Sequence, residues 1–206
     1  MVDPLDGTKE FIRRNDEFTV NIALISGQVP EMGIIYAPCL DIMYFGSDQT
    51  GAYRFMEYSS MDGQFQNRED LMKEAEKLPL KIPRQSYTAI ASRSHRNEHT
   101  DLFIKGLQKK YKSLKFVSTG SSLKFCLMAE GKADIYPRFG PTMEWDTAAG
   151  HAIALSSGCS VKIHEKEEGL IYNKEVLINP KFIVLRTPGP PFFRWPWHKP
   201  SACRRY

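Results

Sequence analysis

Apolar and polar residues alternate along the first quarter of the chain. Residues 18–25 place apolar side chains on one face of a strand (Phe18, Val20, Ile22 and Leu24). A Gly-Gln turn at 27–28 separates this strand from three more predicted strands, at 29–36, 41–45 and 52–55. This part of the chain is therefore expected to form an antiparallel meander. A short helix is predicted at 9–13 and another at 67–77.

The second half of the chain changes rhythm. Helical periods are predicted at 97–111, 121–130 and 146–156, and short apolar strands at 87–91, 114–117 and 133–136. Gly131 and Gly158 stand where two of these helices should end. Strands that alternate with helices predict an α/β layered fold. The rhythm divides the chain into residues 1–83, residues 84–185 and a tail at 186–206.

The tail differs from the rest in composition. It contains two of the three tryptophans and a run of prolines, which favours extended, unpaired backbone. Its five basic residues come with no acid, so subtracting them from the net charge of +4 leaves −1 for residues 1–185. A near-neutral body does not argue for a nucleic-acid polymer as partner. The tail either contacts membranes or partners, or is a disordered extension with no role.

Length and cysteine content narrow the class further. The chain has 206 residues, enough to bury a core, and it contains no apolar run long enough to span a membrane. No basic and apolar leader follows Met1, so we expect a cytoplasmic protein, with peripheral membrane contact through the tail left open. The four cysteines lie far apart and form no CxxC pair, which is typical of reduced thiols rather than a zinc site (Cys39, Cys126, Cys159 and Cys203).

One acidic motif opens the chain, at residues 3–8 (Asp-Pro-Leu-Asp-Gly-Thr). Two carboxylates three residues apart, with a proline between them, can converge on one cation, and the Leu5 carbonyl could add a third oxygen ligand. Mg²⁺ prefers such ligands. A helix that starts after Gly7 would also turn free N–H groups toward an anion. The alternative is an ordinary turn at Asp6-Gly7 with Asp3 as a cap.

A second acidic motif occupies residues 144–150 (Glu-Trp-Asp-Thr-Ala-Ala-Gly). Asp146 stands at a predicted helix start, so taken alone it is more typical of a helix cap than of a ligand. The small residues that follow it permit close approach to another backbone. His151 and Cys126 lie in helices among apolar residues, and we interpret both as packing residues.

Together the two motifs resemble the signatures of the inositol monophosphatase superfamily, DPxDGT and WDxAAG, in the same order. The resemblance is closest to its 3′(2′),5′-bisphosphate nucleotidase branch (CysQ type) and covers residues 2–185 but not the tail. Supporting segments lie at 3–12, 18–24, 92–95, 120–126 and 136–142. It implies a layered αβαβα sandwich, in which the meander sheet precedes the alternating α/β half. Residues 1–83 would be the remnant of the metal and phosphate domain.

The resemblance also implies a reaction, the Mg²⁺-dependent removal of the 3′-phosphate from adenosine 3′,5′-bisphosphate, a by-product of sulfate assimilation, to give AMP. Two or more ions would be held by Asp3, the Leu5 carbonyl, Asp6 and Asp146. Asp3 and Thr8 would be catalytic, Thr8 by orienting the attacking water. Two bound cations suit such a step, since they neutralise phosphoryl oxygens and lower the pKa of water.

Further residues resemble substrate-contacting positions of the branch. Besides Leu5, Asp6, Gly7, Thr8 and Asp146, they are Ser92, His95, Ser121, Lys124 and Arg138. Lysine and arginine suit phosphate by charge and geometry. Each also has a simpler interpretation: Lys124 and Arg138 as solvated surface charges, His95 as a loop histidine, and Ser121 as the cap of its helix.

The chain departs from the family pattern at its start. About eighty family residues before the first motif have no counterpart, including covering helices, a metal-ligating glutamate and a water-activating acid. We therefore expect a fragment, an internal start or a degenerate member, with weak Mg²⁺ binding, greatly reduced turnover and low solubility. The alternatives are inositol-monophosphatase-like activity and a non-catalytic nucleotide-binding remnant.

Overall fold

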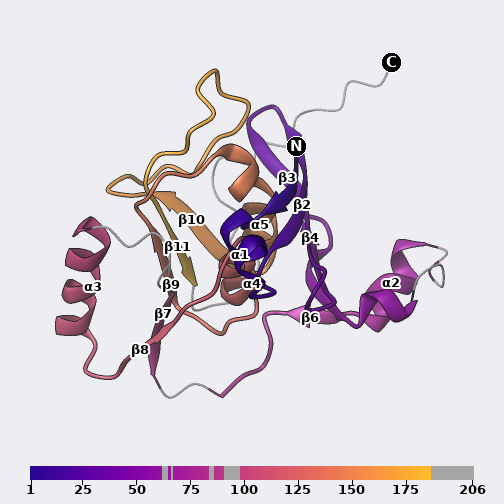
Figure 1. The fold of residues 1–206 in the computed structure, drawn as a ribbon, viewed down its shortest axis with the longest axis horizontal. Coiled ribbons are helices and arrows are strands. Elements are labelled where there is room, and N and C mark those ends of the chain that lie inside the picture. The colour runs from indigo at the N-terminus through magenta and orange to yellow at the C-terminus, as the bar shows by residue number, and fades with distance from the viewer. Residues whose placement is uncertain (62–64, 66, 84–85, 91–97, 187–206) are drawn as a thin grey trace.

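The computed structural model describes residues 1–61, 65, 67–83, 86–90 and 98–186. Its strands form two sheets, and two helices lie between them (Figure 1). These are α4 (Leu123–Ala129) and α5 (Glu144–Ser156). A longer helix, α3 (Glu98–Lys110), lies on the outer side of the second sheet. The expected layered α/β sandwich is confirmed. Within the described ranges, no helix combines the length and apolar character needed to cross a membrane.

The first sheet is the predicted antiparallel meander, with six strands in chain order. The strands are β1 (Val2–Asp6), β2 (Thr19–Ser26), β3 (Val29–Ala37), β4 (Ile42–Ser47), β5 (Gly51–Met56) and β6 (Glu76–Leu78). Two short helices, α1 (Thr8–Arg13) and α2 (Arg68–Glu74), and a 3-10 turn, η1 (Tyr58–Met61), connect them. The helix predicted at 67–77 was too long, because residues 76–78 pair with β5 instead.

The second sheet has five strands, in the order β10-β11-β9-β7-β8. They are β7 (Tyr87–Ile90), β8 (Leu114–Val117), β9 (Ile135–Arg138), β10 (Cys159–Ile163) and β11 (Phe182–Arg186). β7 runs parallel to β8 and β9, whereas β11 runs antiparallel to β9 and β10. The alternating half is therefore confirmed, although the sequence did not indicate β10 and β11. The domain boundaries at 83 and 185 stay a prediction.

Helix α5 packs directly on the first sheet through small residues, as its sequence suggested. A Cβ atom at Gly33 of β3 would lie 2.2 Å from the carbonyl oxygen of Ala149. On the other side of the helix, a Cβ at Gly150 would lie 2.5 Å from the Phe125 ring of α4. Since backbone cannot retreat cheaply, these glycines set how close the layers lie, and hence where the first turn of α5 lies relative to β1.

Replacing Gly33 with alanine is therefore expected to lower the free energy of unfolding by about 3 kcal/mol, the upper range for overpacking a core. Gly106 provides a matched control, because nothing lies within 4 Å of a Cβ there and the residue is inside α3. Alanine at 106 should stabilise the chain by roughly 1 kcal/mol through helix propensity. Denaturant unfolding of both variants checks the pair. Equal effects in the two variants would contradict the close contact.

The two faces of the first sheet differ in polarity. Toward α5, strand β2 presents Thr19, Asn21 and Ala23, all at most 5% exposed. The opposite face, which we call the outer face, carries a cross-strand row of apolar residues (Val2, Ile22, Ile34, Phe45 and Tyr53). At β4 and β5 it is covered in part, since Phe55 contacts the rings of Tyr58 and Phe65.

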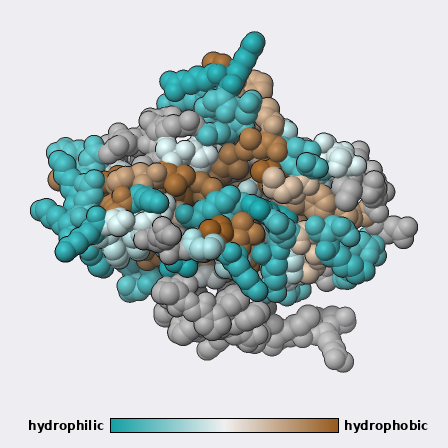
Figure 2. Space-filling view, turned by 90° about the horizontal axis from the view of Figure 1, so that it is seen from below, coloured by the Kyte–Doolittle hydropathy of each residue, from teal (hydrophilic) through white to brown (hydrophobic). Residues whose placement is uncertain are grey.

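At β1 and β2 the outer face is open. Ile22 is 42% and Leu24 53% exposed. The apolar alternation in 18–25 thus marks a face that no described residue covers fully, while the buried face is partly polar. Patches of apolar side chains also lie between hydrophilic ones on the surface seen in Figure 2. Low solubility stays a prediction, for which this exposure is the physical reason.

Candidate metal and phosphate site

A register shift in β1 brings Asp3 and Asp6 to the same face of the sheet. Residues three apart on a regular strand point to opposite faces. Here Asp3 lies opposite Asn21 and Asp6 opposite Thr19, so three steps along β1 match two along β2. The extra residue in β1 turns Asp6 to the face that carries Asn21 and Thr19, which is the face toward α5. This strand was missed from the sequence.

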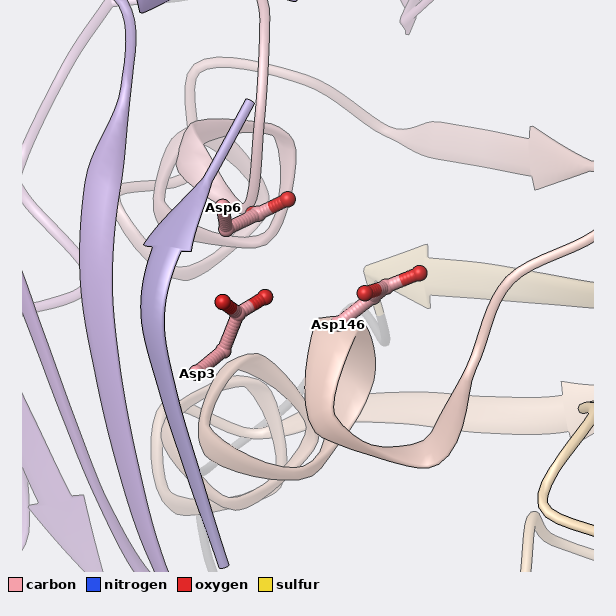
Figure 3. Close-up of side chains that lie close together, drawn as sticks. All are labelled: Asp3, Asp6 and Asp146. Carbon is pink, nitrogen blue, oxygen red and sulfur yellow. The ribbon is translucent and has the colours of Figure 1, made fainter. Parts of the chain in front are cut away.

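Asp146 reaches the two β1 carboxylates from the first turn of α5. One carboxylate oxygen of each of Asp3, Asp6 and Asp146 lies within 4.8 Å of the others. Figure 3 shows the three side chains side by side, two from β1 and one from the helix. Asp146 also accepts a hydrogen bond of 2.9 Å from the Met143 N–H, so it closes a capping box as the third residue of α5, whereas the N-cap residue itself is Met143. A cap and a cation ligand are compatible, because a carboxylate can accept several partners.

The cluster carries unbalanced negative charge. Burial, together with the charges of Asp6 and Asp3, raises the pKa of Asp146 to about 6, against the hydrogen bond from the Met143 N–H and the charge of Arg138. Burial and the charge of Asp6 also raise the pKa of Asp3, against a hydrogen bond of 3.1 Å from the Leu5 N–H. Three hard oxygen ligands with mutual repulsion fit a divalent cation such as Mg²⁺, which would relieve that repulsion.

A cavity of about 240 Å³ adjoins this cluster. Residues from both halves of the chain line it, including seven predicted site residues: Asp6, Gly7, Thr8, Ser121, Lys124, Arg138 and Asp146. Asp3 and Leu5 lie next to it in β1. Ser92 and His95 fall outside the described residues. The motif residues, more than a hundred positions apart in sequence, thus line one space.

Two basic side chains that line this cavity, Lys124 and Arg138, are buried, so they are not solvated surface charges. Lys124 is 7% and Arg138 8% exposed. The Lys124 ammonium donates to the Thr119 carbonyl at 3.3 Å, and the Arg138 guanidinium to the Pro141 carbonyl at 3.0 Å. The buried Nε of Arg138 has no acceptor among the described residues. A buried donor without a partner is costly, which suits an anionic ligand at this place.

Gly7 lets the chain turn from β1 into α1. Its φ of +88° is a left-handed conformation, and a Cβ there would lie 3.1 Å from the Cβ of Ser121. The turn places Thr8, an exposed residue, on the cavity wall as the first residue of α1. Ser121 does not cap its helix. The cap residue of α4 is Ser122, and it makes no side-chain cap bond.

His151 and Cys126 are buried, as expected for packing residues. Burial lowers the pKa of His151 to about 3, and its Nδ1 lies 2.9 Å from the Tyr172 hydroxyl. The imidazole is therefore neutral and faces the interior. Cys126 is packed in the core cluster.

Sequence reasoning missed the polar residues behind the cluster, Thr19, Asn21 and Ser122. A signal for two of them was present, because they are the polar positions in the alternating run 18–25. That run was interpreted by its apolar face, although a strand has two faces and periodicity does not say which one is buried.

Fold and site together define a class of protein. It is a layered α/β protein in which a cluster of carboxylates suited to a metal cation lies beside a cavity lined by buried lysine and arginine side chains. The model of the inositol monophosphatase family matches residues 1–186. A crystal structure of CysQ from Bacteroides thetaiotaomicron superposes with a TM-score of 0.87 at 52% identity, over 90% of this chain and 68% of that one. The chain belongs to the inositol monophosphatase family.

Curated relatives point to one branch of this family. The 3′(2′),5′-bisphosphate nucleotidase CysQ of Salmonella typhimurium is 42% identical over 184 residues, which are 89% of this chain and 66% of that protein. The protein of the same name from Escherichia coli K12 is 41% identical over the same length. The chain spans about two thirds of the length of these relatives.

Proposed function

We propose that this chain is a Mg²⁺-dependent phosphomonoesterase of the 3′(2′),5′-bisphosphate nucleotidase type, acting on adenosine 3′,5′-bisphosphate to give AMP and phosphate. One observation supports this most directly: the carboxylate cluster adjoins a cavity that is also lined by the two buried basic side chains of Lys124 and Arg138. A cation site next to anion-binding side chains fits a substrate with phosphate groups. The names of the curated relatives support the choice of nucleotide.

Each residue has a distinct part in this proposal. Asp3, Asp6 and Asp146, with the Leu5 carbonyl, would hold Mg²⁺, in two or more ions. When bound, Mg²⁺ would neutralise phosphoryl oxygens and lower the pKa of a water molecule. Thr8 would orient that water by its hydroxyl. Ser121, Lys124 and Arg138 would contact the nucleotide, together with Gly7 and with Ser92 and His95. A cytoplasmic location stays a prediction.

Slow turnover is expected. Mg²⁺ gives up its hydration shell reluctantly, and it binds weakly where protein ligands are few. Within the described ranges, the acidic group that could hold a metal contains three carboxylates. Three carboxylates are a small set for two ions, so millimolar Mg²⁺ should be needed.

The test is phosphate release from adenosine 3′,5′-bisphosphate at several Mg²⁺ concentrations, with AMP and inositol 1-phosphate as control substrates. We expect release that depends on Mg²⁺ and stops after one phosphate, leaving AMP. Preference for inositol 1-phosphate would overturn the branch assignment. Calorimetric binding of adenosine bisphosphate with no release in any condition would instead favour a non-catalytic binding protein.

A further inference from the structure

Three donors converge on a single oxygen of Asp6. The Ser121 hydroxyl and the Ser122 N–H each donate to Asp6 Oδ2 at 2.6 Å, and the Asn21 amide donates at 3.4 Å. Among the described residues no hydrogen bond to Asp6 Oδ1 is found. One oxygen of this carboxylate is therefore held by the protein, and the other is left for a further partner.

These donors and Thr19 form one hydrogen-bonded group of polar side chains, most of which are buried. Thr19 Oγ1 lies 2.5 Å from Ser121 Oγ, 2.7 Å from Ser122 Oγ and 3.0 Å from Asn21 Oδ1. The Ser122 hydroxyl donates to Asn21 Oδ1 at 2.8 Å. Thr19, Asn21 and Ser122 are at most 2% exposed. We call Thr19, Asn21, Ser121 and Ser122 the Asp6 network.

Counting protons gives this network a direction. Each hydroxyl has one proton, and Ser121 uses its proton on Asp6, so the Thr19 hydroxyl can donate either to Ser121 Oγ or to Asn21 Oδ1. Ser122 then donates to Asn21 Oδ1, while the amide nitrogen of Asn21 turns toward Asp6. The branch through Ser121 and the branch through Asn21 both end on Asp6 Oδ2. Hydrogen bonds in such chains strengthen one another, most of all where the last acceptor is charged.

The backbone at Ser121 indicates that its hydroxyl has a purpose. Its φ is +50°, a left-handed conformation that costs a non-glycine residue about 1 kcal/mol. Glycine would adopt this conformation without that cost. The preceding Gly120 is tightly held, because its N–H donates to Glu17 at 2.7 Å and a Cβ there would lie 2.5 Å from Glu10. The turn thus aims the Ser121 hydroxyl at Asp6.

We propose that Thr19, Asn21, Ser121 and Ser122 are positioning residues for Asp6, which fix its carboxylate for a divalent cation. The inference rests on the proposed function, since the cation belongs to that site. The network also joins β2 to the turn before α4, which are about a hundred residues apart in sequence. Cation affinity should therefore depend on hydroxyl groups that do not themselves contact the ion.

Mn²⁺ binding, followed by electron paramagnetic resonance on the full chain, tests this directly. Ser121→Gly removes the hydroxyl and suits the left-handed backbone, so we expect Mn²⁺ affinity to fall about 10- to 100-fold, the usual range for groups behind metal ligands. Thermal unfolding of this variant without metal should occur at an unchanged or higher temperature.

A second pair of variants tests Thr19. Thr19→Val should weaken Mn²⁺ binding, whereas Thr19→Ser should retain it. Ser157→Ala, a buried hydroxyl at the far end of α5, is the matched control.

Several outcomes would overturn the inference: wild-type Mn²⁺ affinity in Ser121→Gly, equal affinities in Thr19→Val and Thr19→Ser, or no Mn²⁺ binding by the unsubstituted chain. Failure of the proposed function looks different. In that case Mn²⁺ binding would respond to the variants as expected, but no phosphate would be released from adenosine 3′,5′-bisphosphate.

Discussion

Replacing Asp146 with asparagine should strongly reduce Mg²⁺-dependent phosphate release while making the metal-free chain more stable. Asparagine keeps an oxygen that can accept the Met143 N–H, so the cap of α5 survives. It removes one of three carboxylates that lie within 4.8 Å of one another. Cation stabilisation in phosphoryl transfer is worth several kcal/mol, so release should fall by about a hundred- to a thousandfold.

The gain in stability follows from the sign of the pKa shift. Burial, and then the charges of Asp6 and Asp3, raise the pKa of Asp146 to about 6 in the folded chain, from its ordinary value of 3.8. The folded state therefore holds its proton at a pH where the unfolded state has lost it. The resulting loss of stability grows as pH rises from 3.8 through 6 and is complete above. Because the group is partly exposed, we expect about 1 kcal/mol at neutral pH.

Thermal unfolding at pH 7.5 and pH 4, with and without MgCl₂, measures both effects. At pH 7.5 without metal, the unfolding temperature of Asp146→Asn should exceed that of the unsubstituted chain by about 2–4 °C. At pH 4 the two should agree more closely. Added Mg²⁺ should stabilise the unsubstituted chain and leave the variant almost unchanged. Asp70→Asn, at a partly exposed aspartate of α2 that pairs with Lys73, is the control. A full Mg²⁺ response in Asp146→Asn would contradict the ligand assignment.

Local patterns in the sequence predicted the elements whose residues obey one period. The meander strands and the helices of the second half were found because alternation or helical spacing persists along them. β1 was missed for a physical reason: it contains Pro4 and two aspartates, residues with low strand propensity, and an edge strand tolerates them. Its pairing depends on β2, which no local pattern shows.

The site shows the same division between local and tertiary information. The two motifs name Asp3, Asp6 and Asp146, and their resemblance to a family brings them together. The extra residue in β1 that turns Asp6 inward was not predictable from spacing, since it depends on register with β2. Nor was the burial of Lys124 and Arg138, which depends on how the two halves pack. Charged side chains are ordinarily expected at the surface.

Substitution of Glu144 should destabilise the chain strongly, although this residue lies outside the acidic cluster. Its side chain is fully buried at the first residue of α5 and pairs with the ammonium of Lys174. It also accepts the N–H groups of Asn173 at 2.8 Å and Lys174 at 3.2 Å. These bonds fasten the loop before β11 to the helix turn that carries Asp146. Removing one partner of a buried pair leaves the other uncompensated, which typically costs 3–5 kcal/mol.

We therefore expect Glu144→Gln to destabilise the chain by about 3 kcal/mol, at the lower end of that range because Lys174 keeps some contact with water. The unfolding temperature should fall by roughly 6–12 °C. Mg²⁺ should also bind more weakly, since Asp146 lies two residues further along the same turn.

Glu167→Gln provides the matched control, because Glu167 pairs with Lys162 but is 87% exposed. Its loss should change stability by less than about 1 kcal/mol. If the two glutamine variants unfold at the same temperature, the anchoring role of Glu144 is wrong. If Glu144→Gln combined with Lys174→Met recovers part of the loss, the cost lay in the unpaired charge rather than in the lost volume.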